Sequence, residues 1–498
     1  MTDAYDLFVI GGGINGAGIA RDAAGRGLKV LLAEKGDLAE GTSSRSGKLV
    51  HGGLRYLEYY EFRLVREALI EREVLLEAAP HIVRPMRFVL PHAPAQRSAI
   101  LVRLGLFLYD HLGGRRRLPS SRRLDLARAP EGKPIRDGFR IGFEYADCWV
   151  DDARLVVLNA LDAAARGADV LTRTKVIRAR RGDTAWHVTL RAEAGAEREV
   201  TARILVNAAG PWVEAVLSDV IGENTRRHVR LVKGSHIVVG KFWDGPHAYI
   251  LQNDDRRVIF VVPYHDDLCL IGTTDIPFHG APESVAIDET ERRYLLGAVN
   301  RYMRRGLTEH DIVYEYSGVR PLYDDAEANP SAVTRDYVFD VEGGAGRPAL
   351  LSVFGGKITT YRKLAEHALE KLKPFCPALG GKWTARGKLP GGDIPSGDPE
   401  TFATELAGRL PQMPRRLLGL YSRQYGTRAT TLLDGAQTPA DLGRHFGGLL
   451  YEREVEFLRD TEWAKTAEDV LTRRTAHHLD MSQDEQTRFA AWYEGAKS

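Results

Sequence analysis

The stretch that decides the fold is DLFVIGGGINGAGIARDAAGRG, residues 6–27. It opens with a short apolar run of strand formers, Asp6–Ile10, passes through a glycine-rich turn and continues in small residues that predict a helix over Ala17–Gly27. A second apolar run, Val30–Ala33, follows and predicts another strand. A strand, a glycine turn, a helix and a second strand in this order are typical of a doubly wound α/β sheet.

The glycines of the turn indicate that a dinucleotide binds there. Gly11 permits the tight turn, Gly13 lets the backbone approach a pyrophosphate, and Gly16 lets the helix pack closely on its strand. The pyrophosphate would lie on free N–H groups at the positive helix end, and Ile14 and Asn15 of the turn are expected among the cofactor contacts. The competing interpretation is a glycine-rich connector in an ordinary doubly wound sheet.

The acid that ends the second strand supports the dinucleotide interpretation. Glu34 can accept hydrogen bonds from the hydroxyls of an adenosine ribose, and Lys35 lies next to it. The loop that follows, GTSSRSGKLVHGGLRY at residues 41–56, is dense in hydroxyls and glycines, where a nicotinamide enzyme usually begins a plain crossover. Such a loop can wrap a diphosphate and lie against a flavin ring, which favours FAD over NAD. The contacts expected from it are Thr42, Ser43, Ser44, Lys48, Leu49, Val50 and His51.

Two later strand ends complete the predicted cofactor site. The strand Ile204–Asn207 ends in small residues, and the strand Leu350–Phe354 leads through a glycine turn into a helix predicted over Thr359–Lys371. The positive end of that helix would stabilise the negative charge of a reduced flavin. Packing alone is the competing explanation for the small residues. The further cofactor contacts expected are Val176, Ala209, Gly210, Trp212, Gly355, Gly356, Lys357, Ile358 and Thr359.

Taken together, these segments resemble the FAD-dependent glycerol-3-phosphate dehydrogenases, within the superfamily of D-amino-acid-oxidase-like flavoproteins. The resemblance extends over essentially the whole chain. It rests on GGGINGAGIARDAAGRGL, GTSSRSGKLVHGGLRYLE, EYADCWVDDARLV, NAAGPW, KGSHIVV, IGTTD, YSGVRPL, TRDY and LLSVFGGKITTYRKLAEHAL. One departure is Gly47, where the family usually carries Thr or Ser, so a hydroxyl contact to the cofactor is missing.

The resemblance implies that the cofactor is FAD, and it also implies which reaction the enzyme catalyses. The reaction oxidises sn-glycerol 3-phosphate to dihydroxyacetone phosphate by hydride transfer from C2 to flavin N5, and the electrons pass to a membrane quinone. The implied fold is α/β, with a Rossmann-like FAD-binding domain interleaved with a mixed-sheet substrate cap domain, plus an all-helical C-terminal domain. We expect the FAD-binding domain at 1–75, 145–215 and 330–388, the cap at 76–144 and 216–329, and the C-terminal domain at 389–498. Asp398 is the expected N-cap of the first C-terminal helix.

A phosphate dianion calls for Arg or Lys donors. The resemblance implies that the substrate pocket is lined by Arg55, Tyr56, Arg320, Arg335 and Lys357. Oxidation of a secondary alcohol also requires a base for the hydroxyl proton, and histidine has a suitable pKa. His51 and His236 are the two candidates, and either could instead be a packed residue. Arg320 joins them as a catalytic residue, because a cation near the alcohol favours the alkoxide.

Residues 96–123 change in composition. Ile100, Leu101, Leu104 and Leu108 form one helical face, and arginines surround it at Arg97, Arg103, Arg115, Arg116, Arg117, Arg122 and Arg123. Apolar residues flanked by arginines suit a helix that lies in a membrane interface. A core helix of the cap beside a solvated arginine-rich loop is the alternative. The resemblance includes peripheral inner-membrane enzymes that reduce quinone, which favours the membrane interpretation.

Composition limits the other classes of function. The 498 residues exceed a single core, and the net charge of +2 gives no drive toward nucleic acid. The three cysteines lie far apart, so we expect neither a disulfide framework nor a metal site. There is no signal-peptide pattern and no apolar run of about 18 residues. We therefore expect a peripheral protein at the cytoplasmic face of the inner membrane or in the cytoplasm, able to form a homodimer.

Three alternatives stay open at this point. A glycerol-3-phosphate oxidase would share the flavin and substrate sites but give its electrons to oxygen. An amino-acid or sarcosine-type oxidase would need fewer cations for its carboxylate substrate. A non-catalytic flavin-binding scaffold at a membrane would need no base.

Overall fold

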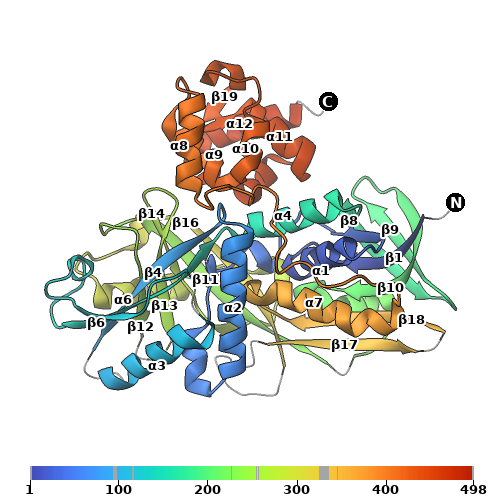
Figure 1. The fold of residues 1–498 in the computed structure, drawn as a ribbon, viewed down its shortest axis with the longest axis horizontal. Helices are drawn as coiled ribbons and strands as arrows, with labels where there is room; N and C mark the ends of the chain where they lie inside the picture. Colours follow the sequence, from blue (N-terminus) through green and yellow to red (C-terminus); the bar gives the residue numbers. More distant parts are fainter. Residues whose placement is uncertain are drawn as a thin grey trace.

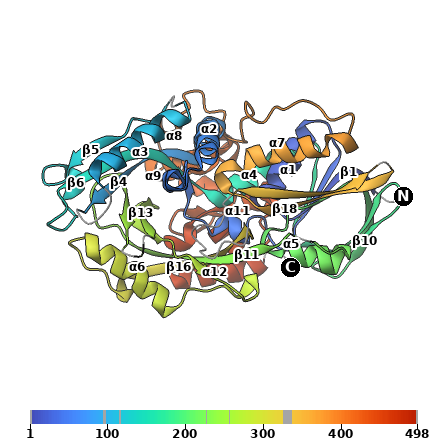
Figure 2. The same ribbon diagram turned by 90° about the horizontal axis from the view of Figure 1, so that it is seen from below.

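The computed structural model describes residues 3–93, 98–114, 117–225, 227–253, 255, 257–324, 336–344 and 346–495. Two mixed β-sheets lie side by side, and the C-terminal helices gather in a separate body against them (Figure 1). Seen from below, that body lies largely behind the sheets (Figure 2). No described helix is both long enough and apolar enough to span a bilayer.

The first sheet is the Rossmann-like part of the fold. Its strand order is β17-β18-β10-β1-β2-β7, with β8 and β9 continuing from β10. β1 runs parallel to both β2 and β10, and β10 runs parallel to β18, so their carboxyl ends meet at one edge. The strands are β1 (Asp3–Ile10), β2 (Val30–Ala33), β7 (Asp169–Leu171), β8 (Thr174–Arg181), β9 (Trp186–Ala192), β10 (Glu197–Asn207), β17 (Tyr337–Gly344) and β18 (Arg347–Gly355). The four strands predicted from the sequence all lie in this sheet.

Three helices cover one face of the first sheet. α1 (Ile14–Gly25) packs between α4 (Asp152–Ala165) and α7 (Tyr361–Leu372), which come from distant parts of the chain (Figure 1). α1 begins three residues earlier than predicted, because the glycine turn ends at its N-cap, Gly13. α7 begins two residues later than predicted, because a 3₁₀ turn, Ile358–Thr360, precedes it. The late helix α7 thus completes the layer that α1 starts.

The second sheet has the order β15-β11-β14-β13-β12-β4-β6-β3, with β16 beside β11 and β5 beside β6. Most of its pairs are antiparallel, and β12 with β4 is parallel, so the predicted mixed sheet is confirmed. Its strands are β3 (Leu49–Val50), β4 (Val83–His92), β5 (Arg122–Asp125), β6 (Ile141–Val150), β11 (Val229–Gly240), β12 (Ala248–Gln252), β13 (Val258–Tyr264), β14 (Leu268–Gly272), β15 (Ile276–Pro277) and β16 (Ile312–Tyr323). Helices α2 (Phe62–Ala78), α3 (Ala99–Leu112) and α6 (Glu289–Tyr302) flank it. The predicted domain boundaries stay a prediction.

The C-terminal body has its own core. It contains α8 (Pro399–Arg409), α9 (Arg415–Tyr425), α10 (Ala429–Leu432), α11 (Glu452–Glu462) and α12 (Gln483–Gly495), around a cluster of buried side chains. Asp398 caps α8 as predicted, since its carboxylate accepts hydrogen bonds from the N–H groups of Glu400 and Thr401. The body is not helical throughout, because a short hairpin joins β19 (His445–Gly447) to β20 (Leu450–Tyr451). Gly447 and Gly448, both with positive φ, make that turn, a signal the sequence interpretation overlooked.

A buried ion pair attaches this body to the first sheet. Arg154 of α4 donates to both carboxylate oxygens of Glu462 in α11, and both side chains have no solvent exposure. Arg428 donates to the same carboxylate from within the C-terminal body. Burial by itself would raise the pKa of Glu462, but the two arginines outweigh it and lower that pKa to about 2. The carboxylate is therefore charged at every pH at which the fold is used.

Removing this charge is expected to destabilise the fold. Glu462→Gln leaves the Arg154 guanidinium buried without a counter-charge, which costs about 3–5 kcal/mol. Asp398→Ala removes only an exposed helix cap and costs about 1 kcal/mol. Urea unfolding of both variants checks the difference. A Glu462→Gln protein no less stable than Asp398→Ala would contradict the account of this junction.

Candidate active site

A cavity of about 1510 Å³ receives its walls from both sheets. The first sheet contributes the ends of β1 and β2 and the glycine turn, and the second contributes β13 and β16. The loop at 41–56 and the turn before α7 close the sides. The lining includes these predicted cofactor residues: Gly11, Gly13, Ile14, Asn15, Glu34, Lys35, Thr42, Ser43, Leu49, His51, Val176, Ala209, Gly210, Trp212, Gly355, Gly356, Lys357, Ile358 and Thr359.

The glycine turn holds α1 so close to β1 that side chains are excluded. Gly11 has a φ of +110°, and a Cβ there would lie 2.6 Å from the carbonyl oxygen of Ala208. A Cβ on Gly16 would lie 1.9 Å from the carbonyl oxygen of Gly11. Only glycine fits at either position. The N-terminus of α1 consequently opens directly into the cavity.

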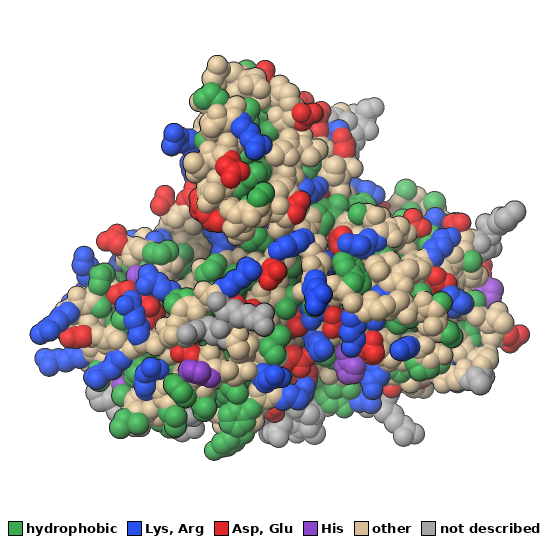
Figure 3. All heavy atoms as spheres, viewed as in Figure 1, with side chains coloured by type: hydrophobic (Ala, Val, Ile, Leu, Met, Phe, Trp, Pro, Cys, Tyr) green, Lys and Arg blue, Asp and Glu red, His purple; other side chains and the backbone are tan. Residues whose placement is uncertain are grey.

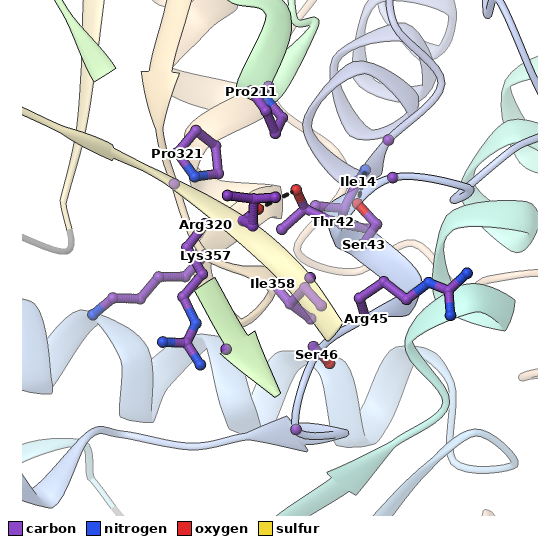
Figure 4. Close-up of a pocket in the computed structure, with 18 of the residues that line it drawn as sticks. Ile14, Thr42, Ser43, Arg45, Ser46, Pro211, Arg320, Pro321, Lys357 and Ile358 are labelled. Carbon is purple, nitrogen blue, oxygen red and sulfur yellow. Dashed lines mark hydrogen bonds between the residues drawn. The ribbon is translucent and has the colours of Figure 1, made fainter. Parts of the chain in front are cut away.

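The loop at 41–56 lies against that helix end. Ser43 accepts a hydrogen bond from the N–H of Ile14 at 3.0 Å, and Thr42 donates to the carbonyl of Val319 at 2.6 Å (Figure 4). Asn15 donates to the carbonyl of Gly355 at 3.2 Å, while its own buried amide oxygen has no partner among the described residues. The helix start, the loop and the turn before α7 are therefore joined around one space. The amide oxygen of Asn15 can still accept a hydrogen bond there.

Glu34 lines the cavity directly after the end of β2. Its two carboxylate oxygens accept hydrogen bonds from the N–H of Gly12 at 2.6 Å and of Gly36 at 2.9 Å. Burial raises the pKa of Glu34, and the hydrogen bonds from Gly36 and Gly12 limit the rise. The carboxylate is thus fixed at the end of β2, where an adenosine ribose binds in this kind of fold.

Four of the predicted cofactor residues do not line the cavity: Gly16, Ser44, Lys48 and Val50. Gly16 acts through the close packing just described. Lys48 is buried, and its ammonium donates to the carboxylate of Asp152 and to the carbonyl of Ser44 at 2.9 Å. Val50 is a strand residue of the second sheet that pairs with Cys148. The predicted contacts of Ser44, Lys48 and Val50 with the cofactor stay a prediction.

The predicted substrate residues that the structure describes all line the cavity. They are Arg55, Tyr56, Arg320 and Lys357. The ammonium of Lys357 lies 4.0 Å from the centre of the Tyr56 ring. Figure 4 shows the Arg320 and Lys357 side chains extending toward the same side of the view, while Arg45 extends the opposite way. Arg335 lies outside the described residues.

Arg320 is held in place by groups that were not predicted. Its guanidinium donates to the carboxylate of Asp275 and to the hydroxyl of Thr273 at 2.7 Å. Both partners lie in the IGTTD motif, so the motif was a signal, but the sequence did not disclose the pairing. Arg45, Ser46 and Tyr316 also line the cavity without having been predicted. Their positions within quoted motifs were the available signal.

Both candidate bases face the cavity as neutral imidazoles. His236 stacks on Tyr316 with ring centroids 4.8 Å apart, and neither of its ring nitrogens has a partner among the described residues. Burial lowers the pKa of His236 well below its usual value, and the charges of Arg320 and Lys48 add to the effect. Burial also lowers the pKa of His51; Asp147 opposes this and Lys357 reinforces it. A neutral imidazole can accept a proton.

Gly47 leaves space beside His236. A Cβ at this position would lie 3.5 Å from Nε2 of His236, at ordinary contact distance, so a methyl group would fit there. The described residues contain no group of three or more His, Cys, Asp or Glu side chains that could hold a metal ion. The polar groups that line the cavity include cations, amides, hydroxyls, imidazoles and carboxylates such as Glu34.

A Rossmann-like turn, a hydroxyl-rich loop and a late helix that converge on one large cavity define a dinucleotide-binding oxidoreductase fold. The described residues fit a dinucleotide, because the glycine cradle leaves no room for side chains and the buried oxygen of Asn15 awaits a donor. A family model described as "FAD dependent oxidoreductase" matches residues 6–362. The chain belongs to this family, and FAD is its cofactor.

Two relatives and one solved structure match this chain over nearly its full length. A Brucella abortus protein named D-erythritol 1-phosphate dehydrogenase is 61% identical over 495 residues, covering 99% of this chain and 98% of that protein. A Pseudomonas aeruginosa glycerol-3-phosphate dehydrogenase is 54% identical over 492 residues, covering 99% and 95%. The solved structure of a Bacillus halodurans glycerol-3-phosphate dehydrogenase complexed with FAD matches with a TM-score of 0.74 at 26% identity, covering 99% of this chain and 94% of that one.

Proposed function

We propose that this enzyme oxidises sn-glycerol 3-phosphate to dihydroxyacetone phosphate and passes the electrons to a membrane quinone. The observation that carries the proposal is the cavity lining, in which Arg320 lies near His236, Lys357 lies near His51, and both imidazoles are neutral. Cations suit a phosphate, and a neutral imidazole suits the proton of an alcohol. Relatives more than half identical over the full length and named for polyol phosphates support the same substrate class.

The cofactor contacts are proposed from the lining of the cavity. The helix start at Gly13, Ile14 and Asn15 would hold the pyrophosphate, Glu34 the ribose, and the loop at Thr42 and Ser43 the diphosphate side. Gly356 and Lys357, before the 3₁₀ turn and α7, would meet the flavin. When bound, FAD supplies the acceptor for the hydride that leaves C2 of the substrate.

Arg320 is the central phosphate ligand in this proposal. Asp275 and Thr273 fix its guanidinium, so little rotamer freedom is lost when a phosphate binds. Lys357 and Arg55 would add charge around the same anion, and the Tyr56 ring under Lys357 holds that ammonium in the cavity. The positive groups also favour the alkoxide form of the alcohol, which lowers the demand on the base.

We assign His51 as the base. His236 is only 2% exposed and is stacked on Tyr316, so its ring has little room to approach a substrate. His51 is more exposed to the cavity and lies within the electrostatic reach of Lys357. Its backbone N–H donates to the hydroxyl of Thr359 at 3.3 Å, which attaches the loop to the turn before α7. His51 would accept the hydroxyl proton while the hydride leaves the neighbouring carbon.

D-erythritol 1-phosphate is the second candidate substrate. The relative with that name is 61% identical, against 54% for the Pseudomonas aeruginosa glycerol-3-phosphate dehydrogenase. The two substrates share a phosphate and a secondary alcohol, and erythritol phosphate adds one hydroxymethylene unit. The space beside His236 at Gly47 is one place in the cavity wall where added volume would fit.

A membrane location is proposed from the surface of α3. Ile100, Leu101, Leu104, Phe107 and Leu108 are all exposed, so this helix does not bury that face in the cap. Tyr59, Tyr60 and Phe62, at the start of α2, extend the exposed apolar surface. Figure 3 shows hydrophobic side chains gathered along the lower edge of the molecule, with Lys and Arg side chains above and beside them. Such a surface suits a peripheral position in an anionic leaflet.

The proposed electron acceptor follows from that location. An enzyme held at the cytoplasmic face of the inner membrane would reach a quinone dissolved in the bilayer. The names of the full-length relatives are those of dehydrogenases, which favours a quinone over oxygen as acceptor. The homodimer expected from the sequence stays a prediction.

The substrate is tested by comparing Arg320→Ala with the unchanged enzyme on both polyol phosphates, using a soluble quinone analogue as acceptor. Loss of charge-assisted contacts worth about 1.5–3 kcal/mol each lowers kcat/KM by at least about tenfold. Activity on unphosphorylated glycerol is the comparison, because there Arg320→Ala removes only the effect on the alkoxide, so the loss should be smaller than on the two phosphates. Unchanged kcat/KM in Arg320→Ala would reject the assignment. The better of the two substrates, by kcat/KM, decides between the candidates.

The pH profile tests the base. Because the pKa of His51 is lowered, its imidazole stays neutral as the pH falls through about 6.5, the usual histidine value. We therefore expect kcat/KM to hold down to that pH and to decline only below it. His51→Gln should lower kcat by about a hundredfold or more. An acid limb centred at or above the usual histidine pKa, or an unimpaired variant, would show that His51 is not the base.

Membrane binding is tested by placing charges on α3. The double variant Leu104→Glu/Phe107→Glu should lose most of its co-sedimentation with anionic phospholipid vesicles, since it puts two acids into the surface that enters the headgroup layer. Val313→Glu is the matched control, because Val313 is also an exposed apolar residue but lies in β16. Equal vesicle binding by the two variants would remove the membrane role of α3.

A further inference from the structure

The C-terminal body reaches the cofactor site through one carboxylate. Asp37 lies three residues after Glu34, in the loop that follows β2, and its side chain has no solvent exposure. Two arginines of the C-terminal body enclose it. Arg473 donates from Nε to Oδ2 at 2.7 Å, and Arg474 donates from Nη1 to Oδ2 and from Nη2 to Oδ1, both at 2.7 Å. Three charge-assisted hydrogen bonds thus join this loop to residues more than four hundred positions later.

The two arginines are themselves fixed within the body. Arg473 also donates to the carboxylates of Asp469 and of Glu468, the latter at 3.0 Å. Asp469 in turn accepts from Arg173, at 3.0 Å, which belongs to the first sheet's side of the junction. Burial by itself would raise the pKa of Asp469, but hydrogen bonds and the nearby arginines lower it to about 2. Charges of both signs therefore alternate across the junction and are buried with their partners.

The loop at 34–40, which contains Asp37, forms one end of the cavity. The N–H of Asp37 donates to Glu40 at 2.6 Å, and the N–H of Gly36 donates to Glu34 at 2.9 Å. The backbone of Arg173 closes the other side, donating to the carbonyl of Gly36 at 2.8 Å. Glu34, Lys35, Gly36 and Glu40 all line the cavity, and so does Glu468 of the C-terminal body. A residue of the C-terminal body consequently forms part of the cofactor cavity itself.

We propose that the C-terminal body is a working part of the FAD site, in which Arg473 and Arg474 hold Asp37 so that the loop at 34–40 keeps the shape that binds the adenosine end of FAD. Asp37 is a positioning residue, because it does not line the cavity and acts through Glu34 and its neighbours. If docking of the body favours FAD, binding of FAD must favour docking by the same factor. A body that served only to stabilise the fold would show no such coupling.

The test measures the rate at which FAD leaves the holoenzyme, followed by the rise in fluorescence of the released flavin. Asp37→Asn keeps the shape of the side chain but removes the charge that the two arginines hold. We expect it to speed FAD release by about tenfold, the factor for one lost charge-assisted contact. Asp266→Asn is the matched control. It breaks another contact of the C-terminal body, the pair of Arg416 with Asp266 at 3.1 Å, which does not involve the loop at 34–40.

The outcomes separate the two interpretations. Faster FAD release in Asp37→Asn with unchanged release in Asp266→Asn supports the proposal. Unchanged release in Asp37→Asn, or equal acceleration in both variants, overturns it. If Asp37→Asn does not fold, amide hydrogen exchange of the unchanged full-length protein decides. Exchange at 469–474 should be slower in the holoenzyme than in the flavin-stripped chain, and equal rates would overturn the proposal. No substrate is used, so failure of the proposed substrate leaves this test unaffected.

Discussion

The close approach of α1 to the end of β1 is the constraint on which the rest of the structure depends. It exists because Gly16 can lie against the carbonyl of Gly11 and because Gly11 adopts a left-handed φ. That approach brings the N-terminus of α1 into the cavity with its amides unobstructed, and one of them already donates to Ser43. A side chain at either glycine would push the helix away from the sheet, and the anion-binding end would lose its position. The loop at 41–56, the turn before α7 and the small residues after β10 all pack around this point.

The second constraint is electrostatic. Arg55, Arg320 and Lys357 line the cavity, and a carboxylate and a hydroxyl fix Arg320. The same charges, together with burial, lower the pKa of His236, and burial with Lys357 lowers that of His51. A site that attracts an anion therefore also keeps its imidazoles neutral and able to accept a proton. In the proposed function, phosphate binding and proton removal are in this way consequences of one distribution of charge.

Local signals were enough to predict four strands of the first sheet, which has eight in the described part of the chain. The apolar runs before Gly11, Glu34, Ala208 and Gly355 are strands because each is bounded by turn residues, and α1 and α7 follow from periodicity. The partners of Arg320 could not be predicted, since Asp275 and Thr273 meet it only when β16 and the segment after β14 are brought together by the sheet. The hydrogen bonds from Arg473 and Arg474 to Asp37 likewise join segments that are distant in the sequence, so they could not be predicted either. The sequence of α3 is compatible with either a buried or an exposed apolar face, and in the structure Ile100 and Leu104 are exposed.

The central claim is that the FAD held by this cradle is reduced by a polyol phosphate bound to the cationic wall. The most direct measurement is an anaerobic titration of the purified holoenzyme with sn-glycerol 3-phosphate, or with D-erythritol 1-phosphate, followed by the visible absorbance of the flavin. The account predicts that the oxidised flavin band bleaches in proportion to added substrate, with no other electron donor present. A flavin that stays oxidised with both compounds would contradict it.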